Sequence, residues 1–116
     1  MKKISVADVQ SYAAPGHYDM KAYRIQGKEE SGIQTFWMGQ SFFEPGGGAE
    51  WAYEDNPFEK VYYVLKGEMT CKSKDETFVL KPGDSIFIAP FEGREIKNTG
   101  DGVCEMLVII TYKAPE

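Results

Sequence analysis

The chain has 116 residues, enough for one compact domain and too few for two. Its formal net charge of -5 argues against nucleic acid and anionic membrane surfaces as partners, and a hydrophobic fraction of 42% is usual for a soluble protein. No apolar segment approaches the roughly 20 residues that span a bilayer, and the N-terminal lysines lack the apolar segment of a signal peptide. We therefore expect a single cytoplasmic domain over residues 1–116.

Short β-branched and aromatic segments alternate with turns that contain Gly, Pro or Asp. The stretch Ser5–Asp8 has the spacing of a helix-capping box and fits either a short N-terminal helix or an edge strand. Residues 27–32 are predicted as a surface turn, and a strand over 34–43 is predicted to stop at residues 45–48. Further strands are predicted over residues 19–26, 69–73, 77–80, 85–90, 94–98 and 103–112, and one more ends at Gly67. This pattern predicts an all-β sandwich or barrel.

The two cysteines, Cys71 and Cys104, lie in separate strand-like segments without a CxxC partner or a nearby cluster of metal ligands. Such a pair makes no disulfide framework, which agrees with a reducing cytoplasm. We predict that both are buried, unreactive thiols.

The stretch from Gly46 to Glu68 carries the most informative spacing in the chain. Gly48 and Gly67 stand at the two glycines of the pattern G-x5-H-x-H-x3/4-E-x6-G. The positions written His, His and Glu are occupied by Glu54, Asn56 and Lys60.

A second pattern, G-x5-P-x-G-x2-H-x3-N, begins at Gly83 and places Arg94 at its histidine and Asn98 at its asparagine. The two patterns resemble the conserved motifs of the cupin family, and the resemblance covers residues 34–111. It implies a small double-stranded β-helix, the jelly-roll barrel, over about residues 34–112, of the compact bacterial kind.

The resemblance places cations where the family has metal ligands. Lysine and arginine have no lone pair to give at neutral pH, and Lys60 and Arg94 would repel a divalent ion. Glu50 can share a face with Glu54, since even spacing along a strand keeps residues on one side. Together with Asn56 they still make a poor cage, so we expect no metal cofactor.

Strand alternation predicts which side chains line the barrel. If Lys60 points inward, so do Tyr62 and Val64, and if Arg94 does, so does Ile96. The long strand has one face with Phe36, Met38, Gln40 and Phe42 and another with Trp37, Ser41 and Phe43, and the sequence leaves open which face lines the cavity.

Two functions remain open. In one, the barrel binds a small anion such as a carboxylate or sugar acid through Lys60 and Arg94, with Glu54 as an acid or base for isomerase or lyase chemistry. Asn56, Glu50 and Tyr62 are then further binding residues. In the other, a structural or dimerisation module, Glu54, Lys60 and Arg94 form an ion-pair network that fills the former metal site. The role of His17, the only histidine, stays open.

Aromatic residues make up 14% of the chain, more than one small barrel can comfortably bury. The cupin resemblance also implies association through a sheet face. We therefore predict a homodimer, with Trp37, Phe43, Tyr63 and Leu65 as candidates on outward faces.

Overall fold

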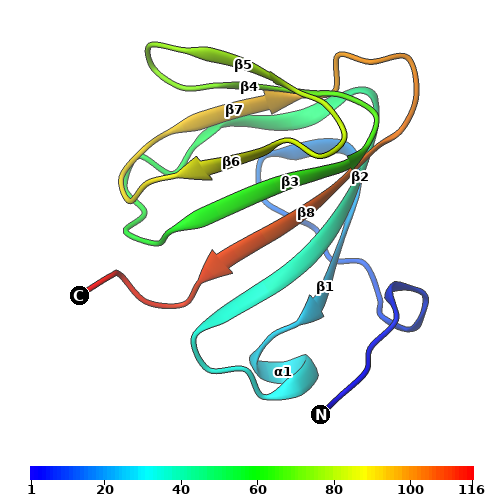
Figure 1. The fold of residues 1–116 in the computed structure, drawn as a ribbon, viewed down its shortest axis with the longest axis vertical. Helices are drawn as coiled ribbons and strands as arrows, with labels where there is room; N and C mark the ends of the chain where they lie inside the picture. The colour runs from blue at the N-terminus through cyan, green and yellow to red at the C-terminus, as the bar shows by residue number, and fades with distance from the viewer.

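A computed structural model describes residues 1–116 and shows a nearly closed barrel of antiparallel strands (Figure 1). The strands are β1 His17–Gln26, β2 Phe36–Ala52, β3 Lys60–Lys66, β4 Met69–Lys72, β5 Thr77–Leu80, β6 Ser85–Ile88, β7 Arg94–Lys97 and β8 Cys104–Thr111. Their order in the sheet is β5-β4-β7-β2-β8-β3-β6, and β1 pairs with β2. The predicted all-β barrel is confirmed.

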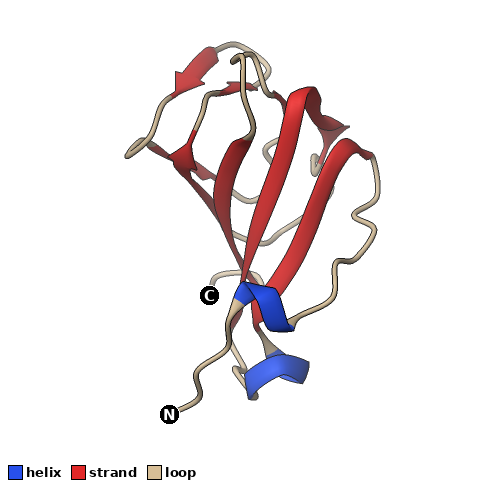
Figure 2. Cartoon of the chain, turned by 90° about the vertical axis from the view of Figure 1, so that its right-hand side faces the viewer, coloured by secondary structure: helices blue, strands red, loops and turns tan.

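Two short helical segments accompany the strands, and Figure 2 shows both near the end of the barrel where the N-terminus lies. A 3-10 turn, η1, spans Val6–Asp8, but the Ser5 side chain makes no capping hydrogen bond. The predicted surface turn contains a four-residue helix, α1, over Lys28–Ser31. None of the helices is long and apolar enough to cross a membrane.

Strand β2 continues where the sequence predicted a stop. It runs through Pro45 and the three glycines to Ala52, and β1 pairs with it from Met38 to Ala49. On its other edge β2 pairs with β8 along its first part and with β7 along its last. Gly48 makes the pairing with β7 possible because it has no Cβ. A Cβ at this position would overlap the carbonyl oxygen of Ile96 in β7. The glycines therefore let two strands approach closely instead of ending one.

The second motif fixes the turn before β8 through Asn98, which is fully buried. Its amide nitrogen donates to the carbonyl oxygens of Phe43 at 3.0 Å and Gly102 at 2.9 Å. Its Oδ1 accepts from the backbone nitrogen of Gly100 at 2.9 Å. Asn98 thus ties the turn to β2, which explains an asparagine at this position in physical terms.

Side chains alternate between the barrel interior and the outside, as the strand pattern predicted. Lys60, Tyr62 and Val64 are buried along β3, and Arg94 and Ile96 are buried along β7. In β2, Ser41 and Phe43 are buried, so the face that also carries Trp37 points into the barrel.

The prediction of outward aromatics is half wrong. Trp37 and Phe43 lie inside because they share the inward face of β2, whereas Tyr63 and Leu65 are exposed on β3. The outer face has its own apolar row, in which aligned strands place Met38, Ile109, Val61 and Phe87 side by side across β2, β8, β3 and β6.

Candidate functional site

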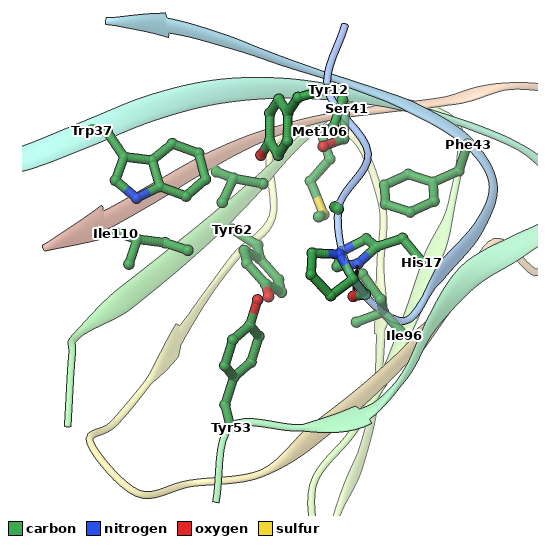
Figure 3. A pocket seen from close by; sticks show the side chains of 14 residues that line it. Tyr12, His17, Trp37, Ser41, Phe43, Tyr53, Tyr62, Ile96, Met106 and Ile110 are labelled. Carbon is green, nitrogen blue, oxygen red and sulfur yellow. Dashed lines mark hydrogen bonds between the residues drawn. The ribbon is translucent and has the colours of Figure 1, made fainter. Parts of the chain in front are cut away.

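A cavity of about 170 Å³ lies inside the barrel, and hydrophobic residues make up 11 of the 14 that line it (Figure 3). Strands β2, β3 and β8 supply much of the wall, including Phe43, Tyr62 and Met106. The segment before β1 and the first residue of β1 supply the rest of one side, with Tyr12 and His17. The cavity is thus an apolar chamber with a few polar groups.

Arg94 is buried beside this chamber, with 2% of its surface exposed. Its Nε donates to the hydroxyl oxygen of Tyr62 at 2.9 Å, and its Nη1 donates to the backbone carbonyl of Glu50 at 2.8 Å. No carboxylate pairs with the guanidinium. A buried cation held only by neutral groups is costly, so this arrangement favours an anion nearby.

Lys60 is a second buried cation, with 1% exposure. Its Nζ donates to Oδ1 of Asn56 at 3.0 Å and to the carbonyl oxygen of Phe58 at 3.2 Å. Desolvation lowers the pKa of Lys60, and the positive charge of Arg94 lowers it further. Lys60 and Asn56, both predicted binding residues, are therefore in contact, but this cation also lacks a carboxylate partner.

Tyr53 connects the two cations to the cavity that it helps to line. Its ring centroid lies 4.5 Å from Nζ of Lys60 and 4.6 Å from Cζ of Arg94. Both distances fit cation–π attraction. Tyr53 takes a φ of 79°, in the left-handed region that non-glycine residues rarely adopt.

The predicted meeting of Glu54 with the two cations is wrong. The left-handed turn at Tyr53 ends the alternation of β2, so Tyr53 faces the cations while Glu54 is exposed in an outer groove near Gly93. The one salt bridge in the chain joins Lys81 to Glu68 at 3.4 Å and involves neither motif cation. No ion-pair network fills the barrel.

Glu50 likewise contributes only its backbone carbonyl, since its side chain is exposed. Ala49 is the buried neighbour, and the β2–β7 pairing shifts register between Ala49 and Ala52, which breaks the even spacing assumed for Glu50 and Glu54. Neither acid lines the chamber.

Tyr62 presents a hydrogen-bond donor to the chamber. Because its hydroxyl oxygen accepts from Arg94, its own O–H is free to donate, and no protein acceptor takes it. Burial raises the pKa of Tyr62 to about 12, so the hydroxyl stays protonated at neutral pH. In Figure 3 the hydroxyls of Tyr62 and Tyr53 point toward one another.

His17 is a cavity residue that the motif patterns did not reveal. Its Nδ1 lies 2.9 Å from the carbonyl oxygen of Pro15, which can only accept, so Nδ1 carries the proton and Nε2 keeps a lone pair. Desolvation lowers the pKa of His17 despite the Pro15 contact, and the charge of Arg94 lowers it further. The chain offered no signal for this, because the residue lies outside both motifs.

The structure gathers no group of three His, Cys, Asp or Glu residues that could hold a metal ion. The two cysteines are free and buried, as predicted, and burial raises the pKa of each thiol to about 11. The chemistry present is therefore hydrogen-bond donation by tyrosines, one neutral imidazole and two buried positive charges.

Known proteins resemble this chain in both sequence and fold. A family model described as a cupin domain matches residues 40–110. A beta-D-galactosidase of Mycobacterium tuberculosis is 34% identical over 116 residues, which cover 100% of this chain and 98% of that protein.

Solved structures share the fold at lower identity. The polyketide cyclase RemF from Streptomyces resistomycificus has a TM-score of 0.84 and 23% identity, covering 100% of this chain and 82% of that one. A sugar phosphate isomerase of the cupin superfamily from Silicibacter pomeroyi has a TM-score of 0.78 and 16% identity, covering 97% and 76%. These likenesses extend to the fold alone.

Proposed function

The chain belongs to the cupin family, and from that premise we propose that its barrel binds a small anionic organic molecule without the help of a metal ion. The acidic group of the ligand lies at the Tyr53 and Tyr62 end of the chamber, under the positive charges of Arg94 and Lys60.

One observation carries the proposal: two fully buried cations lie together with no carboxylate to neutralise them. Removing an unpaired charge from water costs several kcal/mol, and an anionic ligand offsets part of that cost. The free Tyr62 O–H gives the ligand a donor, and the hydrogen bond from Arg94 polarises that donor. The ligand is thus held by a charge-assisted network.

Proton transfer is the reaction type that these groups support. His17 is the one neutral base on the chamber wall, and Tyr62 is a protonated hydroxyl that also lines the chamber. Glu54 lies outside the chamber and is not placed to act there. An isomerase or lyase activity on the bound acid would therefore depend on His17 rather than Glu54.

Isothermal titration calorimetry with a panel of small carboxylates, sugar acids and phosphates tests the proposal. Arg94→Ala should weaken binding of any anionic hit by about 1 kcal/mol or more, because it removes the charge beside the chamber and the hydrogen bond that polarises the Tyr62 donor. Lys97→Ala is the matched control, because Lys97 is exposed on the same strand. If Arg94→Ala leaves the affinity of a hit unchanged while the variant stays folded, the proposal is wrong.

Glycoside hydrolysis is a second candidate, because a full-length relative at 34% identity carries a galactosidase name. Most glycosidases need two carboxyl groups that flank the bond, and the chamber has none. An outer groove of about 350 Å³ does contain Glu54 and Glu92 beside Trp51. A glycosidase mechanism with two carboxyl groups would therefore use this groove and not the chamber.

A chromogenic β-D-galactoside separates the two candidates. Hydrolysis that is lost in Glu54→Gln or Glu92→Gln, and retained in Arg94→Ala, would place a glycosidase in the groove. Glu44→Gln is the control, since Glu44 is exposed and lies outside the groove. Absence of hydrolysis by the wild-type protein would remove this candidate.

A further inference from the structure

We infer that the chamber selects a ring-shaped monocarboxylate, aromatic or alicyclic, and rejects polyhydroxylated acids such as sugar acids. This rests on the proposed function and names its ligand class. The chamber wall has hydrogen-bonding groups for one carboxylate at one end and is mostly apolar elsewhere.

The wall offers few partners for hydroxyl groups. Beyond the Tyr53 and Tyr62 end, the surface is formed by side chains such as Phe43, Met106 and Val108. Tyr12, Ser41 and His17 supply further polar side chains, and Trp37 adds one indole N–H donor. A sugar acid has a hydroxyl on most of its carbons, and each hydroxyl that leaves water without a new partner weakens binding. A ring with one acidic group leaves no such hydroxyl unpaired.

The size of the chamber agrees with a single ring. Pockets for drug-sized ligands are roughly 300–1,000 Å³, well above the 170 Å³ found here. An apolar cavity of about 150 Å³ is known to accept benzene. The remaining space corresponds to a small substituent, which we assign to the carboxylate.

Aromatic side chains give the chamber flat, fixed walls. Trp37 is packed edge to face with Tyr12, with ring centroids 6.5 Å apart. Arg24 lies 5.3 Å from the centroids of both rings and stabilises the pair from outside the chamber lining. Phe43 is fully buried on β2, at the position that pairs with Met20 of β1. Flat rings gain offset or edge contacts with such walls.

The polar end matches one carboxylate. Tyr62 donates its free O–H to one oxygen, and Tyr53 presents a second hydroxyl at the same end of the chamber. The charges of Arg94 and Lys60 lie against the Tyr53 ring, and Arg94 also donates a hydrogen bond to the Tyr62 hydroxyl. On another side of the chamber Arg24 lies behind Tyr12 and Trp37, but it makes no hydrogen bond to a lining hydroxyl, whereas Arg94 donates to Tyr62. A ligand with a single acidic group therefore satisfies the site in one orientation.

Calorimetric titration of the full chain with benzoate, cyclohexanecarboxylate, D-galactonate and benzyl alcohol tests the inference. Both ring acids should bind at least about tenfold more tightly than D-galactonate and benzyl alcohol. Ala14→Leu should weaken benzoate binding because it fills part of the chamber, whereas Ala7→Leu, outside the chamber, should not. Urea unfolding of each variant confirms that both are folded.

The outcomes distinguish this inference from the proposed function. If D-galactonate binds as tightly as the ring acids, the ring selectivity is wrong and anion binding stands. If benzyl alcohol matches benzoate, or if no acid in the wider panel binds, the anion-binding function itself is wrong, and the inference fails with it.

Discussion

Arg94 donates its Nε–H to the hydroxyl oxygen of Tyr62 across 2.9 Å, and both side chains are buried. Arg94 occupies the histidine position of the second motif, and Tyr62 lies on the strand that ends the first. The two motifs therefore meet through a hydrogen bond that a cation donates, where metal-binding members of such a family would meet through a metal ion.

Tyr62→Phe removes the acceptor of this hydrogen bond and leaves a buried charged donor unsatisfied. We expect it to lower the free energy of unfolding by about 1.5–3 kcal/mol, measured by urea denaturation. Tyr63→Phe is the matched control on the next residue of β3, where the side chain is 39% exposed, and should change stability little. Equal effects of the two variants would contradict the buried Arg94–Tyr62 contact.

His17 should titrate below its ordinary pKa of 6.5 because burial disfavours the imidazolium form. Since it is the only histidine, its NMR titration is free of overlap. The unfolded chain binds a proton at a higher pH than the folded chain, so this contribution to stability is complete above pH 6.5 and is lost as pH falls through the folded pKa. His17→Gln should abolish this loss of stability at low pH. An NMR titration midpoint for His17 at or above pH 6.5 would refute the expectation.

The barrel and its two cations were predictable because strand alternation and motif spacing depend only on local sequence. Lys60 and Arg94 are each the first residue of an extended segment, so their inward direction follows from regular geometry. Glu54 was misplaced because the left-handed φ of Tyr53 interrupts that alternation just before it. His17 was missed because its approach to the chamber depends on long-range pairing of β1 with β2.

Gly48→Ala should be strongly destabilising, because the new Cβ meets the backbone of Ile96, which cannot move without shifting β7. We expect a loss of about 3 kcal/mol or more in the free energy of unfolding. Gly102→Ala is the control, since a Cβ there has no atom within 4 Å and no unusual φ. Similar stability of the two variants would show that β2 and β7 do not approach as described.

We propose the apolar row across β2, β8, β3 and β6 as the interface of the predicted homodimer. Phe87, at its edge, is 55% exposed, and Phe87→Lys should shift the protein toward monomer in light scattering after size exclusion. Phe91→Lys is the control, with a side chain 62% exposed on a loop outside the row. A wild-type protein that is monomeric at micromolar concentration would refute the dimer.

The absence of a metal cofactor is a prediction that elemental analysis can test. Protein purified without chelator should carry no stoichiometric transition metal, because Lys60 and Arg94 offer no lone pair and no group of three ligating residues lies together. The replacement Asn56→His, Lys60→Glu and Arg94→His removes both charges and supplies two imidazoles and one carboxylate. Asn56 and Lys60 are hydrogen-bonded to each other, and Lys60 and Arg94 both lie against the Tyr53 ring, so the three positions are close together. This triple variant should therefore gain zinc or nickel binding in calorimetry, provided that circular dichroism shows a folded barrel. Stoichiometric metal in the wild-type protein would overturn the assignment of the two cations to an anion site.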